Sequence, residues 1–333
     1  MRRMIASRGL LVCVLLAGMC GGGAAAHAQG STETPWPAKA VRLIVPFPPG
    51  GATDLVARII ANQVAKDTGQ PVIVDNKPGA GGAIGAAEAA KAAPDGYTVL
   101  LTTSSTHAIA PHLTKPPYDP VKDFTPIMHL ADAASVLLVP PSLPVTSVAE
   151  LIAYAKANPD TLNFASSGNG TIVHLTGEAF KAQTGITMMH VPYKGTALAI
   201  PDLIAGSVHV LFDSIPSGMP HAKNGRLRAL AVTGDTRSSL APDLPTIAEA
   251  GLPGFSSVTW FGLYGPRAVA PGIVTRIHAA FERALRNAEV VAGLTKNGVE
   301  AAKPGSPDAF AATVKTDSDR WGRIIRERGI KLE

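Results

Sequence analysis

The residues best suited to chemistry in this 333-residue chain follow an apolar run and read Phe47-Pro48-Pro49-Gly50-Gly51-Ala52-Thr53-Asp54. Apolar residues then recur at helical spacing from Leu55 to Val64, so the pattern predicts a strand, a glycine turn and a helix. Backbone N–H groups at such a helix start have no partner within the helix and can bind an anion. Because no Gly-Lys-Ser/Thr follows, this is not the phosphate loop of nucleotidases, and a carboxylate fits best.

The end of this segment suits the start of a helix. Asp54 has two interpretations. It is a helix cap or first-turn acid stabilised by the helix dipole, or it points into a cleft, where it selects an amino or hydroxyl group of a ligand or orders water. Gly50 and Gly51 are expected to adopt unusual φ angles and to let a ligand approach the backbone closely. The sequence leaves both interpretations of Asp54 open.

A second loop repeats the arrangement and reads Ser166-Ser167-Gly168-Asn169-Gly170-Thr171. It follows a predicted strand end and precedes a predicted helix, and it combines hydroxyl donors with flexible backbone N–H groups that suit a carboxylate. Alone it would be a turn with an N-cap residue. Two such loops favour a site for one small anion, because ligands of open α/β sheets bind at the carboxyl ends of strands.

Further polar residues follow other predicted strands. Asp213 comes directly after 208–212, and Ser104 follows 98–102. Lys194 and Gly195 end the strand predicted at 187–191, and Lys194 either pairs with a ligand or is a solvated turn residue. His174 lies one turn into the helix after the second loop, either as a packed polar residue or as a ligand contact. All of these are candidate site residues.

Strands that alternate with helices must position these residues, and this order predicts parallel α/β sheets. Two such series of roughly 100 residues each indicate two lobes. Strands are predicted at 41–46, 72–75, 98–102, 135–139, 162–165, 187–191, 208–212, 227–233 and 258–264. Helices are predicted after the first glycine turn, after a second one at 78–82, at 147–158, from 171, and at 197–205, 271–286 and 307–326. Proline-rich connections are expected at 111–126 and 242–253.

The first 28 residues resemble a secretory leader. Three arginines precede a short apolar core, and Ala26-His27-Ala28 forms a small-residue cleavage site. The core is shorter than the roughly 20 residues that span a membrane, and Met19 disfavours lipid attachment at Cys20. The two cysteines, Cys13 and Cys20, both lie in this leader. The sequence therefore predicts a periplasmic protein, cleaved after Ala28, without disulfides or cysteine metal ligands.

Charge and motifs argue against several other functions. The leader holds three of the 30 basic residues, so 27 remain against 25 acids, and no basic run interleaved with aromatics supports nucleic-acid binding. The second glycine turn nearly matches a dinucleotide fingerprint, but Ile84 replaces its third glycine, so no cofactor is expected.

Enzymatic and metal sites have equally little support. Ser167, His174 and Asp213 could form a hydrolase triad, yet no Gly-x-Ser-x-Gly motif surrounds any serine. His174 and Glu178 are spaced to share a helix face, but two residues do not make a metal site. We therefore expect neither catalytic residues nor a metal.

Taken in order, the segments PFPPGGATD, VIVDNKPGAGG, APDGYTVLL, YDPVKDFTPI, LNFASSGNGT, HVPYKG, LPTIAEAG and WFGLYGP resemble the substrate-binding receptors of tripartite tricarboxylate transporters, also called Bug receptors. The resemblance runs from about Pro35 to the C-terminus. It implies an α/β, two-lobe periplasmic-binding-protein fold (Venus flytrap, type II-like) with two chain crossovers, near 131–134 and 233–236. Residues 29–131 and 234–333 would form lobe 1, and 132–233 would form lobe 2, after a signal peptide at 1–28.

The resemblance also implies a monomeric receptor that captures a small carboxylate between its lobes and delivers it to the membrane permease subunits of such a transporter. Rival functions are a receptor that feeds a sensor kinase and a secreted serine hydrolase that uses Ser167. Related receptors often carry asparagine where this chain has Ala83 and Ala110, and each difference affects either ligand specificity or only a local helix cap. The expected ligand-binding residues are Phe47, Pro48, Gly50, Gly51, Thr53, Asp54, Ser104, Ser167, Gly168, Asn169, Gly170, Thr171, His174, Lys194, Gly195 and Asp213.

Overall fold

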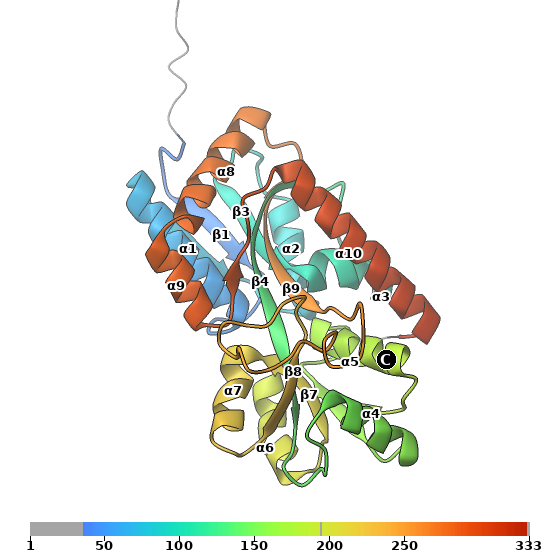
Figure 1. The fold of residues 1–333 in the computed structure, drawn as a ribbon. Helices are drawn as coiled ribbons and strands as arrows, with labels where there is room; N and C mark the ends of the chain where they lie inside the picture. Colours follow the sequence, from blue (N-terminus) through green and yellow to red (C-terminus); the bar gives the residue numbers. More distant parts are fainter. Residues whose placement is uncertain (1–35, 194, 332–333) are drawn as a thin grey trace, which may run out of the picture. The chain divides into compact units, whose positions relative to one another are not determined.

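A computed structural model describes residues 36–193 and 195–331, and Figure 1 shows their arrangement. The predicted leader and Lys194 lie outside these ranges. The first part of the chain alternates strands with helices, as its apolar pattern predicted. Its elements are β1 (Val41–Val45), α1 (Ala52–Thr68), β2 (Val72–Asn76), the 3₁₀ helix η1 (Ala80–Gly82), α2 (Ala83–Ala90), β3 (Thr98–Thr103), the π-helical turn η2 (Ser105–Ile109) and α3 (Ala110–Leu113).

Strand β1 lies between two parallel neighbours, β2 and β3. Val41, Leu43 and Val45 are fully buried in one apolar cluster, whereas Ile44 is fully buried in another. Side chains alternate between the two faces of a strand, so a strand that is covered on both faces needs apolar residues at odd and even positions. This double burial explains the high apolar content of 41–45.

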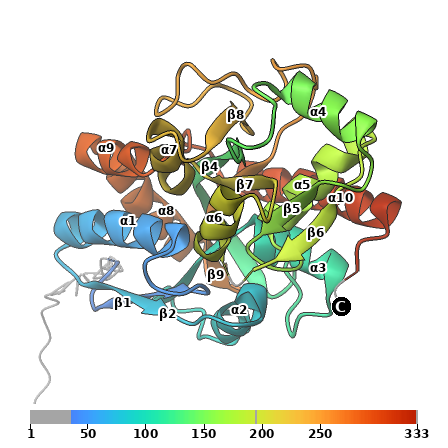
Figure 2. The same cartoon turned by 90° about the horizontal axis from the view of Figure 1, so that it is seen from below.

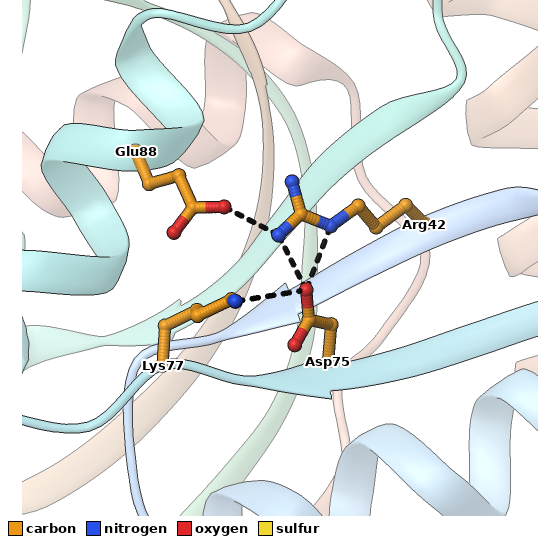
Figure 3. A network of polar contacts seen from close by, with 4 residues as sticks. All are labelled: Arg42, Asp75, Lys77 and Glu88. Carbon is orange, nitrogen blue, oxygen red and sulfur yellow. Dashed lines mark hydrogen bonds and ion pairs between the residues drawn. The ribbon is translucent and has the colours of Figure 1, made fainter.

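Arg42 is the polar residue of β1, and it joins three elements (Figure 3). Its guanidinium donates to Asp75 on β2, with Nε 2.7 Å from Oδ2, and to Glu88 on α2. Lys77 Nζ lies 3.6 Å from the same Asp75 carboxylate. Burial opposes the charge of Arg42, but the hydrogen bonds with Glu88 and Asp75 raise its pKa. The network holds α2, and the glycine turn before it, against β1 and β2.

The long strand β4 (Phe124–Val139) was predicted only at 135–139, because five prolines within 111–126 suggested a loop before it. Pro126 lies where the pairing of β4 with β9 (Val258–Pro266) shifts register, and a proline is tolerated at such a bulge. Strand β4 is antiparallel to β7, β8 and β9. The sheet is therefore mixed: the expected parallel pairing holds for β2-β1-β3 and β7-β5-β6, and it is wrong for the pairs that involve β4 and β9.

The second part of the chain continues from β4 and agrees with the predicted alternation, apart from one additional helix, α7. Its strands pair in the order β4-β7-β5-β6, with β8 also on β4. Its elements are α4 (Val148–Ala157), β5 (Asn163–Ser166), α5 (Ile172–Thr184), β6 (Met189–Pro192), α6 (Thr196–Ala205), β7 (Val210–Ser214), α7 (Ile215–Lys223) and β8 (Arg228–Val232).

The C-terminal elements return to the first set of strands, where β9 inserts between β3 and β4. Figure 2 shows α1, α8 and α9 next to one another, and all three contribute to one apolar cluster. Helix α10 packs on η2, on β4 and on α5. After β9 the elements are α8 (Pro271–Leu285), α9 (Ala288–Lys296), β10 (Glu300–Ala301) and α10 (Pro307–Arg328).

The chain passes between the two groups of strands at Ser135 and again near Ser257. Strand β4 pairs with β9 up to Ala134 and with β7 from Ser135. After β8, Ile247 N–H still donates to Val232, so the chain stays beside β8 well beyond 233–236. The Thr233 hydroxyl accepts from Ser135 N–H at 2.8 Å and donates to the Ser257 carbonyl at 2.6 Å. The predicted lobe boundaries at 131 and 233 remain a prediction.

No helix within residues 36–193 or 195–331 is long and apolar enough to cross a membrane.

Candidate functional site

One cavity, of about 310 Å³, gathers residues from both groups of strands. We call it the cleft cavity. Its walls come from the β1–α1 turn, from η1, from η2 with α3, and from the loop between β5 and α5. The lining residues are Phe47, Ala80, Gly81, Ser105, Ala110, Leu113, Thr114, Asn169, Gly170 and Thr171.

A buried carboxylate holds the β1–α1 turn. Asp54 accepts hydrogen bonds from Gly50 N–H at 2.9 Å, from Arg58 Nε at 2.9 Å and from Asn76 Nδ2 at 3.0 Å. Asn76 also donates to the carbonyl of Phe47. Burial disfavours the charge of Asp54, but these hydrogen bonds and the charge of Arg58 together lower its pKa. The contacts of Asp54 thus agree with the first-turn acid, one of its two interpretations.

The two glycines of this turn differ. Gly50 has a φ of 83°, which favours glycine, whereas Gly51 has an ordinary φ of −81°. A Cβ at Gly51 would meet only the Pro48 carbonyl, at 3.6 Å. The expectation of an unusual φ at both positions is therefore wrong for Gly51. Gly51 caps α1 without a side-chain hydrogen bond, so the first N–H groups of α1 lack an intrahelical partner.

The loop between β5 and α5 is braced by its own hydroxyl groups. Ser166 Oγ accepts from Gly168 N–H at 3.0 Å and lies 2.6 Å from His190 Nε2. The Thr171 hydroxyl donates to the carbonyl of Gly168 at 2.8 Å and accepts from Ser167 Oγ at 3.1 Å. These side chains therefore shape the loop, and their hydrogen-bonding capacity is largely used within it.

His174 anchors the same loop from α5. Its Nδ1 accepts from Gly170 N–H at 3.1 Å, so the proton of the neutral ring is on Nε2. The ring stacks on His190, with centroids 3.8 Å apart and planes 9° apart, and His190 stacks in turn on Phe164. Burial, with a contribution from the charge of Lys181, lowers the pKa of both histidines to about 4. Both rings are therefore neutral at neutral pH.

Several donors remain for a ligand. The side chains of Asn169 and Ser105 line the cleft cavity and make no hydrogen bond to any residue of the described ranges. The first turn of α5, which begins at Ile172, adds backbone N–H groups and the positive end of a helix dipole. Ala80 has a φ of 47°, rare for a residue with a Cβ, and such strain is found preferentially at ligand sites.

The predicted ligand-binding residues fall into two sets: some line the cleft cavity, and others lie behind its wall. Phe47, Asn169, Gly170 and Thr171 line it. Ser167, Gly168 and His174 support the loop, and Pro48, Gly50, Gly51, Thr53 and Asp54 form the turn beneath Phe47 and the start of α1. Lys194 lies outside the described residues.

Three further predicted residues lie at strand ends without lining the cleft cavity. Ser104 is fully buried, and the neighbouring Ser105 lines the cavity instead. Gly195 precedes α6 with a φ of 133°. Asp213 is 1% exposed, and its Oδ2 has no partner among the described residues. Burial raises the pKa of Asp213, which nearby hydroxyls only partly offset.

Several residues that line the cleft cavity were not predicted from the sequence. Leu113 and Thr114 lie in a segment that was interpreted as a proline-rich connection, and Ala80 has no functional group that could attract attention. Gly81 belongs to a glycine turn that was predicted to start a helix, and its resemblance to a cofactor motif gave no sign of an anion site. Ala110 was singled out as a departure from related receptors, and it lies on the cavity wall.

Two other cavities of the described residues are less suited to an anion. One of about 220 Å³ is lined by Asp132, Asp235 and Glu300, and a neighbouring one by Asp132, Asp235 and Asp317. Carboxylates of the cavity wall would repel a carboxylate ligand. No acidic residue of the described ranges lines the cleft cavity.

The geometry gives no sign of a hydrolase triad at the residues considered above. Ser167 donates to Thr171, and His174 Nδ1 accepts from Gly170 N–H, so neither bond joins the serine to the histidine. Within the described ranges, no group of three or more histidine, cysteine, aspartate or glutamate side chains could hold a metal ion.

Comparison with known proteins agrees with a binding site. The chain matches the family described as tripartite tricarboxylate transporter family receptor over residues 56–330. Protein BugT of Bordetella pertussis is 37% identical over 302 residues, which cover 90% of this chain and 92% of BugT.

Two solved structures are similar over almost their whole length. R. palustris Rpa4515 with adipate is 39% identical, with a TM-score of 0.80, and the match covers 89% of this chain and 99% of that chain. MatC from Rhodopseudomonas palustris with bound malate is 35% identical, with a TM-score of 0.76, and the match covers 87% of this chain and 100% of that chain.

Proposed function

Because this chain belongs to the tripartite tricarboxylate transporter receptor family, whose members are periplasmic solute-binding receptors of the Bug type, we propose that it captures a small dicarboxylate in the cleft cavity. The observation that carries the proposal is that one cavity, without acidic lining, joins the β1–α1 turn to the loop before α5.

The size and lining of the cleft cavity support a short dicarboxylate. Its volume of about 310 Å³ lies at the lower end of the range for small-molecule sites. Phe47, Ala110 and Leu113 offer apolar contact, whereas Ser105 and Asn169 offer hydrogen bonds. A ligand with an apolar chain between two carboxylates matches this division, and adipate is bound by a relative of 39% identity. We expect adipate to bind more tightly than the hydroxylated malate.

Backbone and neutral side-chain donors hold the anion in this proposal. No lysine or arginine lines the cleft cavity among the described residues, and Arg58, beneath the turn, is paired with Asp54. The positive end of α5, the Asn169 amide and the Ser105 hydroxyl are the donors at the cavity. Hydrogen bonds to a charged group are each worth about 1.5–3 kcal/mol, so a few of them suffice for micromolar affinity.

Capture would shift the protein toward a closed arrangement, because a ligand that contacts both groups of strands favours the form in which both contacts are made. The loaded receptor, acting as a monomer in the periplasm, then delivers its ligand to the permease subunits of a tripartite tricarboxylate-type transporter. Cleavage after Ala28 releases it there.

Calorimetry with adipate and malate tests the proposal. Asn169→Ala should weaken adipate binding by about tenfold or more, because it removes a hydrogen bond to a charged group. Asn62→Ala, at an exposed position on α1, is the matched control and should bind as the unmodified protein does. Ala110→Trp should abolish binding by filling the cavity. Binding that survives Ala110→Trp unchanged would reject the cleft cavity as the site.

A further inference from the structure

A second cavity, of about 520 Å³, lies between α10 and the strands β4 and β9. Phe124, Tyr264 and His107 are buried in its wall, and the loop before β4 contributes Pro120 and Val121. Helix α10 supplies the opposite wall. None of its lining residues lines the cleft cavity, although η2 contributes to both, with His107 here and Ser105 there. We call it the α10 cavity.

Two buried polar atoms in this wall lack partners. His107 is 2% exposed and Tyr264 is 3% exposed, and neither His107 Nε2 nor the Tyr264 hydroxyl has a hydrogen bond among the residues that the structure describes. The two rings stack with centroids 4.3 Å apart. Buried polar groups in native proteins are nearly always paired, so two unpaired ones beside one cavity need an explanation.

The neighbouring hydrogen bonds define what these atoms can do. The Thr106 hydroxyl contacts the Thr103 carbonyl, which can only accept, and also the Thr102 hydroxyl and His107 Nδ1. With its one proton donated to Thr103, Thr106 Oγ1 accepts from the other two, and His107 Nδ1 carries the ring proton. His107 Nε2 is then an acceptor. Burial lowers the pKa of His107 to about 3 and raises that of Tyr264 well above its ordinary value, so both groups stay neutral. Both atoms are covered in this structure, with less than 1 Å² accessible each, so a ligand reaches this acceptor and this hydroxyl only after a small movement of the wall.

The rest of the lining excludes a charged ligand. Lys315 is the cation of this cavity, and its Nζ lies 2.6 Å from Asp319 in an exposed ion pair on α10. The other walls present Phe124, Pro126 and Val314. Predominantly apolar walls with a few polar groups are typical of small-molecule sites.

We propose that the α10 cavity is a second binding site, for a neutral aromatic alcohol of the phenol class. The ring packs between Phe124 and α10. The single hydroxyl of the ligand donates to His107 Nε2 and accepts from the Tyr264 hydroxyl, which pairs both orphan atoms at once. The site is distinct from the cleft cavity, which takes an anion.

The test is calorimetric titration of the full chain with 2-naphthol at neutral pH. We expect one molecule bound per chain. The ether 2-methoxynaphthalene, which cannot donate, and the anion 2-naphthoate should each bind about tenfold more weakly. Tyr264→Phe should weaken 2-naphthol by about five- to tenfold while leaving the thermal stability unchanged or raised, because an unpaired buried hydroxyl is removed. Adipate binding by this variant should be unchanged.

Two substitutions on α10 locate the site. Ala311→Trp fills the α10 cavity and should abolish 2-naphthol binding, whereas Thr313→Trp, on the same helix but outside this lining, should retain it. The proposal is overturned if 2-naphthol does not bind, if the ether binds equally well, or if Ala311→Trp leaves the affinity unchanged.

Discussion

His174 illustrates how a polar residue near a ligand site can serve the site without contacting the ligand. The sequence left two possibilities, a packed polar residue or a ligand contact. In the structure its Nδ1 accepts from Gly170 N–H, and its ring stacks on His190 in a largely buried environment. The histidine therefore fixes the backbone of a loop whose neighbour, Asn169, faces the cavity.

Buried neutral histidines make the folded protein sensitive to acid. Burial lowers the pKa of His107 to about 3 and that of His174 to about 4, whereas an unfolded histidine titrates near 6.5. Below pH 6.5 the unfolded chain therefore binds more protons than the folded protein does. The contribution of the two neutral histidines to stability is complete above that pH, and it is lost as the pH falls toward 4 for His174 and toward 3 for His107.

Between pH 7 and pH 5, each of these two histidines should lower the free energy of unfolding by on the order of 2 kcal/mol. Urea unfolding at both pH values measures the loss. His174→Gln can still accept from Gly170 N–H but does not titrate, so its loss should be smaller by about 2 kcal/mol. An equal loss in both proteins would show that His174 is not held neutral.

At the scale of elements, the β1–α1 turn shows what a sequence can and cannot predict. The strand, the turn and the helix were all predicted from apolar spacing, because that spacing records which faces are buried. The backbone conformation of each glycine was not predicted correctly, because its φ angle depends on the path that the chain takes through the turn. Gly50 donates to Asp54 at a φ of 83°, whereas Gly51 is extended.

The two glycines therefore give a matched pair of variants. Gly50→Ala places a Cβ at a positive φ and should lower the free energy of unfolding by about 1–2 kcal/mol. In Gly51→Ala the new Cβ meets only the Pro48 carbonyl, at 3.6 Å, so the free energy of unfolding should change by less than about 0.5 kcal/mol. Denaturant unfolding of both variants checks this. Equal destabilisation would mean that Gly51 also needs to be glycine.

Other elements were missed for identifiable reasons. The first part of β4, before the predicted 135–139, was missed because Pro126 suggested a loop, whereas the pairing with β9 accommodates this proline at a bulge. That pairing joins residues more than 120 positions apart in the sequence, so the local spacing of apolar residues cannot predict it. The same limit applies to the site. The loop at 166–171 was predicted as a binding loop, but its meeting with Leu113 and Thr114 depends on how η2 and α3 pack.

At the scale of the whole described chain, the two groups of strands are joined at Thr233. This residue is 1% exposed, and its hydroxyl bridges Ser135 on β4 to Ser257 just before β9. The points where the chain changes from one group to the other are thus held together by hydrogen bonds. Closure around a ligand, as proposed above, would bend the chain at these positions, while the stacked rings and braced loops keep each wall of the cleft cavity intact.

In the proposed function, the cleft cavity holds a short dicarboxylate through backbone and neutral donors. A crystal structure of the complex with adipate tests it most directly. We predict one carboxylate within about 2.7–3.2 Å of Asn169 and the first N–H groups of α5, with the methylene chain against Phe47 and Leu113. Adipate bound outside this cavity, or a carboxylate held by a lysine or arginine side chain instead, would contradict the account.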